Sequence, residues 1–267
     1  MREKRRPKLG QHFLSSPVYQ RKIIEALPLQ GDELVVEVGP GTGAMTGGLA
    51  ERARQVVAVE VDRRLADDLE ELFRDRKNVE IRHGDILEFD PGRLCREFRV
   101  PKCFVFGNLP FHISSPFLQH IFGFAPFLSG MGLLLQYEVA GRIVARPGRR
   151  AYGFLSVLAQ YYSRPKLLWK VPPGAFAPPP QVHSGFVQFE FPGAGKEYGI
   201  EDEEAFLDFL RACFREKRKT LVNNLTKTLP RRNVTDLLAE LGMDSRIRAE
   251  QIDLQGFSVI YRRLKNH

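Results

Sequence analysis

Short apolar runs alternate with amphipathic stretches through the first two thirds of the chain. The apolar runs predict strands over residues 34–38, 56–60, 78–82, 103–106, 132–136, 166–171 and 182–191. Between them, apolar residues at helical spacing predict helices over 17–27, 44–52, 63–73 and 137–145, and a further helix that begins at Ser114. Strands that alternate with helices in this way indicate an α/β fold with a mainly parallel sheet.

The pattern changes near residue 193. Residues 192–200 contain Pro192 and three glycines and have the composition of a linker. Beyond them, an apolar helix over 205–214 with a basic end at 215–219 is followed by two or three short helices over 234–265. We therefore expect an α/β domain over 1–193, which begins with a basic tail and an apolar hook at 1–14, and a small all-α domain over 194–267.

Glycines and acids follow the first three strands of the predicted sheet. The turn after the first strand reads G-x-G-x-G, with glycines at Gly39, Gly41 and Gly43, which suits a nucleoside with a charged amino-acid tail better than a pyrophosphate. Glu60 ends the next strand, where a carboxylate typically binds ribose hydroxyls. Asp85 follows the third strand and can accept the adenine amino group while Ile86 packs on the ring, or it can cap the following turn.

Asn108 follows the fourth strand and begins the sequence Asn-Leu-Pro-Phe. The Asn108 side-chain oxygen and the Leu109 carbonyl can each accept one N–H of an adenine amino group, and Pro110 restricts the backbone that aims this carbonyl. Phe111 can stack on the base, or it can be a core residue beside a turn. Phe176, in the proline-rich loop over 172–180, is either a second ring against the base or a core residue.

An adenosine site beside a base-binding motif favours S-adenosylmethionine as the cofactor, with S-adenosylhomocysteine as the product. We expect the sulfonium to point toward Asn108, and we expect catalysis by positioning and electrostatic stabilisation without a strong base. The sequence therefore predicts a Rossmann-like methyltransferase domain of the S-adenosylmethionine-dependent type.

Positive charge is concentrated in three segments of this chain of 267 residues and net charge +8. Segments 1–8, 142–150 and 211–219 each carry net charge +4, which leaves the rest of the chain slightly acidic. This distribution favours a polyanionic partner over three solvated faces. The residues expected to contact it are Arg146, Arg149, Arg150, Arg215, Lys217, Arg218 and Lys219.

The remaining composition argues against several classes of protein. Cys95, Cys103 and Cys213 share no close spacing, so we expect neither disulfides nor a metal site, as in a cytoplasmic protein. No apolar run approaches the roughly 20 residues that span a bilayer, and the charged N-terminus is not followed by the apolar core of a signal peptide.

Several motifs together resemble one known family, the small-subunit ribosomal RNA adenine N6,N6-dimethyltransferases. Its relatives include the erythromycin-resistance methylases of the large subunit and mitochondrial transcription factor B. The matching segments cover nearly the whole chain: 9–14, 36–43, 60–62, 84–85, 107–116, 136–139, 151–153, 176–182 and 215–220.

The resemblance implies that His12, Leu14, Gly39, Glu60, Asp85 and Asn108 line the cofactor site. It implies transfer of four methyl groups to two adjacent adenosines in a hairpin near the 3′ end of small-subunit rRNA. The partner is then rRNA within an immature 30S particle. The protein would be a cytoplasmic monomer, and its C-terminal domain would contact the rRNA. The family usually has Tyr, Asn and Lys where this chain has Phe111, His112 and Gln181.

Two other functions fit part of the pattern. One is an RNA-binding ribosome assembly factor whose methylation is incidental, and the other is a methylase acting on large-subunit rRNA or on DNA adenine. Intact Asn108, Glu60 and Asp85 favour an active enzyme. The long C-terminal half and its proline-rich loop favour the small-subunit branch over the resistance branch.

Overall fold

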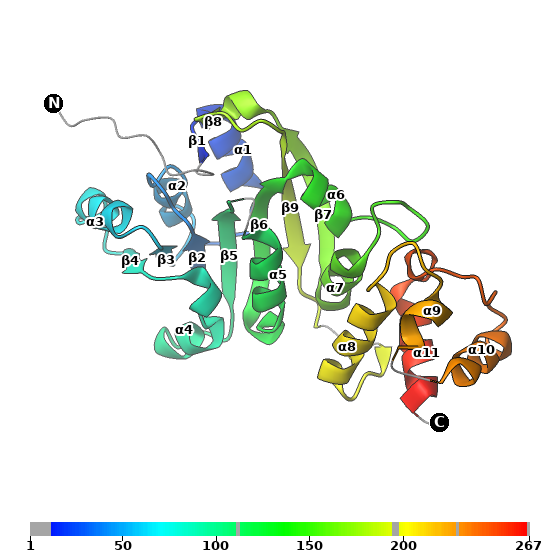
Figure 1. The fold of residues 1–267 in the computed structure, drawn as a ribbon. Coiled ribbons are helices and arrows are strands. Elements are labelled where there is room, and N and C mark those ends of the chain that lie inside the picture. The colour runs from blue at the N-terminus through cyan, green and yellow to red at the C-terminus, as the bar shows by residue number, and fades with distance from the viewer. Residues whose placement is uncertain (1–11, 111–112, 194–197, 228–229, 266–267) are drawn as a thin grey trace. The chain divides into compact units, whose positions relative to one another are not determined.

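The computed structural model describes residues 12–110, 113–193, 198–227 and 230–265. The chain divides into two compact units. The first contains residues 1–140 and 164–191, and the second contains residues 141–163 and 192–267. Figure 1 shows the order of the elements.

A seven-stranded sheet forms the centre of the first unit, in the order β4-β3-β2-β5-β6-β9-β7. Its parallel strands are β2 (Leu34–Val38), β3 (Gln55–Glu60), β4 (Val79–His83), β5 (Cys103–Asn108) and β6 (Leu128–Gln136). The strands β9 (Ser184–Glu190) and β7 (Arg164–Val171) extend the sheet in antiparallel pairing. The predicted strands are therefore all present, and β6 begins four residues earlier than expected.

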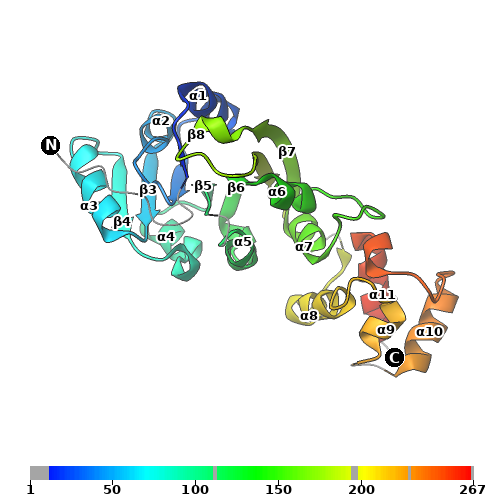
Figure 2. The same cartoon turned by 45° about the horizontal axis from the view of Figure 1, so that its top comes forward.

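Helices cover both faces of this sheet, which explains why its central strands are mostly apolar. Figures 1 and 2 show α1 (Pro17–Ala26) and α2 (Thr46–Ala50) on one face, and α4 (Pro91–Glu97) and α5 (Ser114–Phe122) on the other. The helix α3 (Arg63–Leu72) packs beside β3 and β4, and α6 (Tyr137–Ile143) follows β6.

Two of these helices differ from the sequence prediction. The helix α2 is shorter than the range 44–52, because the glycine turn continues to residue 45. The helix α4 was not predicted, although Asp90 caps it by accepting a hydrogen bond from the Arg93 N–H at 2.8 Å and Pro91 occupies its first turn. An Asp-Pro pair is a helix-start signal that the apolar pattern alone does not contain.

The second unit is helical and includes a segment from the middle of the chain. The helix α7 (Phe154–Tyr162) packs against α8 (Glu203–Cys213) and α11 (Leu254–Lys265), beside α9 (Leu221–Leu225) and α10 (Arg231–Glu240). Tyr161 and Tyr162 donate hydrogen bonds to the Glu203 carboxylate at 3.3 and 2.6 Å. Residues 141–163 thus cluster with the C-terminal helices, whereas the sequence assigned them to a domain over 1–193.

The hook near the N-terminus pairs with the proline-rich loop. The strand β1 (Phe13–Leu14) forms a two-stranded antiparallel sheet with β8 (Phe176–Ala177). The N–H groups of Ser15 and Ser16 both donate to the Ala175 carbonyl, at 2.9 and 3.1 Å. The Phe13 ring lies directly on Gly41, where an added Cβ atom would stand 2.5 Å from the ring.

This close contact predicts a specific penalty for a side chain at Gly41. Gly39 and Gly41 both have positive φ, 63° and 61°, so alanine at either position should cost about 1–2 kcal/mol of unfolding free energy for backbone strain. Only Gly41→Ala also displaces the Phe13 ring, because no atom of the described residues lies within 4 Å of a Cβ at Gly39. Denaturant titration should therefore show the larger loss for Gly41→Ala, and limited proteolysis should cleave its hook faster. Equal losses and equal cleavage in the two variants would contradict this packing.

Candidate active site

The carboxyl ends of the parallel strands bring the predicted site residues to one edge. In the register of the sheet, Val38 of β2 lies between Val59 of β3 and Gly107 of β5. The residues that follow these positions are the glycine turn, Glu60 and Asn108. Ligands of open α/β sheets bind at this edge, as the sequence predicts for this chain.

Glu60 holds the glycine turn in place. Its side chain is 3% exposed, and its two carboxylate oxygens accept hydrogen bonds from the Gly41 N–H at 3.1 Å and the Asp62 N–H at 3.0 Å. Backbone N–H groups stabilise a buried carboxylate, and the carboxylate in turn stabilises a turn with positive φ. The expected contact with a ribose stays a prediction.

Asp85 caps the turn that follows β4. One of its oxygens accepts a hydrogen bond from the Leu87 N–H at 2.9 Å, so the capping role considered from the sequence is present. The side chain is exposed, Ile86 is 7% exposed, and the Gly84 N–H donates to the Glu60 carbonyl at 3.0 Å. Asp85 and Glu60 thus lie near each other, and the contact of Asp85 with adenine stays a prediction.

Asn108 connects the sheet edge to the hook. Its Nδ2 donates to the His12 carbonyl oxygen at 2.8 Å. A carbonyl partner requires the amide nitrogen at this end, so the Oδ1 acceptor is directed away from His12. The Leu109 N–H donates to the Leu134 carbonyl at 3.1 Å, and the Pro110 carbonyl accepts from the Ile113 N–H at 3.1 Å. Phe111 and His112 lie outside the described residues.

The hook residues and Phe176 are packed rather than open. The Nδ1 of His12 lies 2.9 Å from the Pro178 carbonyl oxygen, with which it forms a hydrogen bond. Leu14 is 2% exposed, and Phe176 is 4% exposed in the same apolar cluster. Phe176 is therefore a core residue in this conformation, which was the alternative considered from the sequence. Stacking on a base would require its ring to be uncovered.

A small cavity of about 20 Å³, roughly the size of one water molecule, lies between the hook and the glycine turn. Its lining includes three of the predicted site residues, Leu14, Gly39 and Asn108, and also Glu37, which the sequence analysis did not single out. The lining residues are Phe13, Leu14, Glu37, Gly39, Pro40, Thr42, Ala44, Met45, Phe106 and Asn108. The signal for Glu37 was present in the sequence, since it is the single charged residue within an otherwise apolar strand.

Glu37 is a buried acid in the middle of β2. It is 2% exposed, and Thr46 Oγ1 donates to its carboxylate at 2.6 Å. The pKa of Glu37 is raised to about 7, mainly because the group is buried; the Thr46 hydrogen bond offsets part of this rise and the charge of Glu60 adds to it. Near neutral pH, Glu37 is therefore only partly ionised, and a nearby cation or a higher pH would favour its charged form.

The raised pKa of Glu37 predicts a pH dependence of stability. The folded protein keeps this proton above pH 4.5, where the unfolded chain releases it, so stability falls as the pH rises from 4.5 toward 7. Glu37→Gln keeps an acceptor for Thr46 and removes the ionisation. Denaturant titrations should show the variant gaining about 2 kcal/mol over the wild type between pH 5 and pH 8. The exposed Glu25→Gln is the control, and a parallel response of both variants would refute the assignment.

The two basic segments outside the N-terminal tail lie together in the second unit. Lys217 Nζ donates to the Arg150 carbonyl, and the Gly148 N–H donates to the Glu250 carbonyl at 2.7 Å. All seven residues expected to contact rRNA are exposed: Arg146, Arg149, Arg150, Arg215, Lys217, Arg218 and Lys219. The structure therefore joins two segments that the sequence analysis placed in separate domains, while the basic tail over 1–8 lies outside the described residues.

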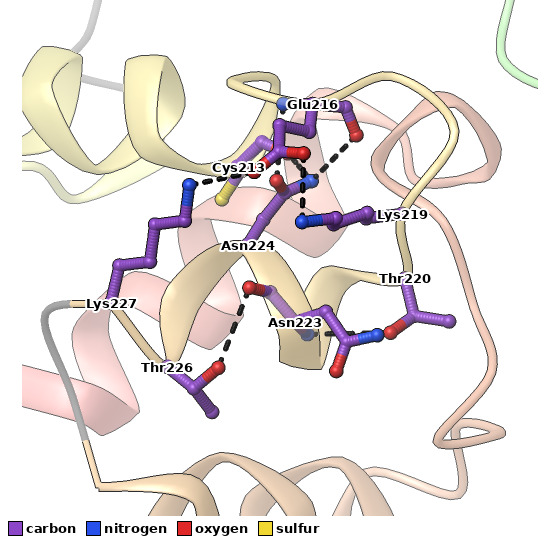
Figure 3. Close-up of polar contacts among 8 residues, drawn as sticks. All are labelled: Cys213, Glu216, Lys219, Thr220, Asn223, Asn224, Thr226 and Lys227. Atoms are coloured by element: carbon purple, nitrogen blue, oxygen red, sulfur yellow. Dashed lines mark hydrogen bonds and ion pairs between the residues drawn. The ribbon is translucent and has the colours of Figure 1, made fainter.

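The basic segment 215–219 is a loop and not the end of a helix. The prediction of a helical end is wrong, because α8 ends at Cys213. Asn224 Nδ2 donates to the Cys213 carbonyl at 2.8 Å and to the Glu216 carbonyl at 3.2 Å, while its Oδ1 accepts from the Glu216 N–H at 3.1 Å (Figure 3). These side-chain bonds replace the next helical turn and hold the loop against α9.

Glu216 pairs with two lysines of this loop region. Its oxygens lie 2.8 Å from Lys219 Nζ and 2.6 Å from Lys227 Nζ (Figure 3). The hydrogen bonds to Lys219 and Lys227 lower the pKa of Glu216 to about 2, so the carboxylate stays charged at any physiological pH. Part of the positive charge of the loop is therefore already paired within the chain.

Within the described ranges, no cluster of three or more His, Cys, Asp or Glu side chains is arranged to hold a metal ion. The three cysteines are buried and free. The described helices include none that is long and apolar enough to cross a membrane.

The chain is similar to named proteins over nearly its full length. The family model described as ribosomal RNA adenine dimethylase matches residues 2–264. A ribosomal RNA small subunit methyltransferase A from Acidobacterium capsulatum is 40% identical over 98% of this chain and 92% of its own. A protein of the same name from Koribacter versatilis is 38% identical over 98% of this chain and 95% of its own.

Two solved structures share the fold. A dimethyladenosine transferase from Plasmodium falciparum has a TM-score of 0.80 at 24% identity and covers 96% of this chain and 98% of its own. The 23S rRNA methyltransferase ErmE has a TM-score of 0.73 at 26% identity, with 95% and 99% covered. The expected Rossmann-like methyltransferase fold with C-terminal helices is thus confirmed, and this chain belongs to the ribosomal RNA adenine dimethylase family.

Proposed function

We propose that this chain dimethylates N6 of two adjacent adenosines in the 3′-terminal hairpin of small-subunit rRNA, with S-adenosylmethionine as the methyl donor. Family membership supports adenine dimethylation of rRNA. The 40% identity to proteins named for the small subunit, against 26% to a 23S rRNA methyltransferase, favours the small subunit. The substrate is then an immature 30S particle, and the enzyme acts in the cytoplasm as a monomer.

The carboxylates and the glycine turn at the sheet edge are of the kinds that S-adenosylmethionine requires. When bound, this cofactor supplies an electrophilic methyl group on a sulfonium. Glu37 lines the cavity under the hook and can pair with the ammonium of the methionine end, which would lower the pKa of its carboxyl. Gly39 and Gly41 let the backbone approach the ligand, Glu60 can accept from the ribose, and Asp85 retains acceptor capacity beyond its capping bond.

The orientation of Asn108 is the observation that carries the proposed chemistry. Because Nδ2 donates to His12, Oδ1 can accept one N–H of the target adenine, and the Leu109 carbonyl can accept the other. Two acceptors would hold the nitrogen in line with the methyl donor and favour the pyramidal amine that forms during attack. No strong base is needed, since the proton leaves an amine that is already positively charged.

Dimethylation places a further demand on this pocket. After the first transfer the nitrogen retains one hydrogen, so only one of the two acceptors keeps its partner. The base must then be held mainly by stacking, for which Phe111 is the proposed residue, at about 1–3 kcal/mol for a base on an aromatic ring.

Removal of the Asn108 amide tests this assignment. Asn108→Ala should lower methylation of undermethylated 30S particles by at least about 100-fold, because the acceptor that positions the nitrogen is lost. Mass mapping of the rRNA identifies the methylated nucleotides and their methyl number. Asn108→Ala also loses the hydrogen bond to the His12 carbonyl. Limited proteolysis of the hook and a cofactor-binding assay therefore show whether activity is lost because the hook has been released. Methylation at the normal rate by Asn108→Ala would contradict the proposed role of Asn108. Methylation of other nucleotides by the wild type would contradict the proposed substrate.

The ion pairs of Glu216 with Lys219 and Lys227 predict that removal of this acid strengthens RNA binding. Glu216→Gln should free Lys219 and Lys227, strengthen particle binding and steepen its salt dependence by about 0.7–0.9 in log–log slope for each phosphate gained. Asp236→Asn removes the same charge from α10 and is the control. Binding titrations over a range of salt concentrations measure both. If binding by the wild type hardly depends on salt, the basic loops are solvated faces and not an rRNA surface.

A further inference from the structure

A second pocket lies in the first unit, and its lining shares no residue with the cavity beside the glycine turn. Its volume is about 330 Å³, at the lower end of the usual size of small-molecule sites. It is formed where β6 leads into α6 and where the chain enters β9, with one residue from β7. The lining residues are Gln136, Tyr137, Glu138, Lys170, Gln181, Val182 and His183.

The sheet register places this pocket at the edge that carries Asn108. Asn108 of β5 is paired with Leu134 of β6, and Gln136 lies two residues farther along the same strand. Two residues along a strand and one strand sideways give a backbone separation of about 8 Å. A nucleotide next to a base held at Asn108 is therefore within reach of the pocket.

The exposed aromatic ring of Tyr137 is the main feature of the pocket. Tyr137 is 40% exposed, and a Cβ at Gly185 would lie 3.5 Å from its ring, so the ring rests on the strand at this glycine. The Tyr137 N–H donates to the His183 carbonyl at 2.9 Å, which fixes the backbone below the ring. Beside it, Val182 is 44% exposed and extends the apolar surface.

One cation and several amides complete the lining. Lys170 Nζ lies 5.1 Å from the centroid of the Tyr137 ring. Gln136 and Gln181 offer both donors and acceptors, and Glu138 contributes one carboxylate. Because its lining has one cation, Lys170, and one acid, Glu138, the pocket does not favour a ligand with several negative charges. It suits a group that combines a flat apolar face, a polar edge and a single negative charge, which is the chemistry of one nucleotide.

We propose that this pocket binds the nucleotide adjacent to the target adenosine in the same RNA strand. The base packs on Tyr137 and Val182, the amides of Gln136 and Gln181 contact its edge, and Lys170 contacts its phosphate. The pocket thereby sets which adenosine of the strand enters the site at Asn108. This inference rests on the proposed function, because it concerns the RNA that the enzyme methylates.

Kinetics on undermethylated 30S particles test the role of the ring. Tyr137→Ala should raise KM for the particle at least fivefold, the low end of base–aromatic stacking, with kcat and cofactor binding close to wild type. Tyr137→Phe keeps the ring and should behave as the wild type. A KM for Tyr137→Ala within twofold of the wild type would overturn the proposal.

The salt dependence of KM tests the phosphate contact independently of the ring. Lys170→Gln should reduce the slope of log KM against log salt by about 0.7, the value for one phosphate of a single strand. Lys166→Gln removes the same charge four residues earlier on β7 and should leave the slope unchanged. Equal slopes for Lys170→Gln and the wild type would remove Lys170 from the site, even if Tyr137→Ala folds poorly.

Photo-crosslinking identifies the occupant of the pocket. With p-benzoylphenylalanine in place of Tyr137, the crosslink should map to a nucleotide next to a methylated adenosine. A crosslink elsewhere in the rRNA, or to a ribosomal protein, would overturn the inference. The wild type in the same assay separates the two proposals: if it does not dimethylate the particle the proposed function fails, whereas normal wild-type activity with unaffected variants rejects the pocket alone.

Discussion

The hydrogen bond from Asn108 Nδ2 to the His12 carbonyl links the parts of the candidate active site. It joins the end of a central strand to the hook near the N-terminus, and the hook in turn pairs with β8 and covers Gly41 with the Phe13 ring. The same bond determines which end of the Asn108 amide is the acceptor. The geometry proposed for the reacting nitrogen therefore depends on a contact between residues 96 positions apart.

Buried carboxylates organise the other side of the site. Glu60 uses one oxygen to bind the Gly41 N–H of the glycine turn and the other to bind the Asp62 N–H after β3, so backbone dipoles stabilise its carboxylate. Glu37 has one hydroxyl donor, and its burial beside Glu60 raises its pKa. The two acids thus differ in their need for a cation. A positively charged ligand in the cavity would therefore favour the charged form of Glu37.

The second unit gathers positive charge by a different means. The loop over 146–150 and the loop over 215–219 are connected by the bond from Lys217 to the Arg150 carbonyl, and Asn224 ends α8 so that the second loop can form. Glu216 compensates part of the charge within the loop. Such compensation reduces repulsion among neighbouring cations in the free protein.

The sequence by itself determined the strands, the glycine turn and the placement of Glu60, Asp85 and Asn108 at one sheet edge, because apolar periodicity is encoded locally and the carboxyl ends of parallel strands meet at one edge. Only the tertiary structure decided that the hook pairs with β8, that Phe176 is buried, that Glu37 lines the cavity and that residues 141–163 join the C-terminal helices. Each of these features depends on contacts between segments far apart in the chain. A local pattern specifies which face of an element is apolar, but the partner that covers this face is selected by the packing of the whole fold.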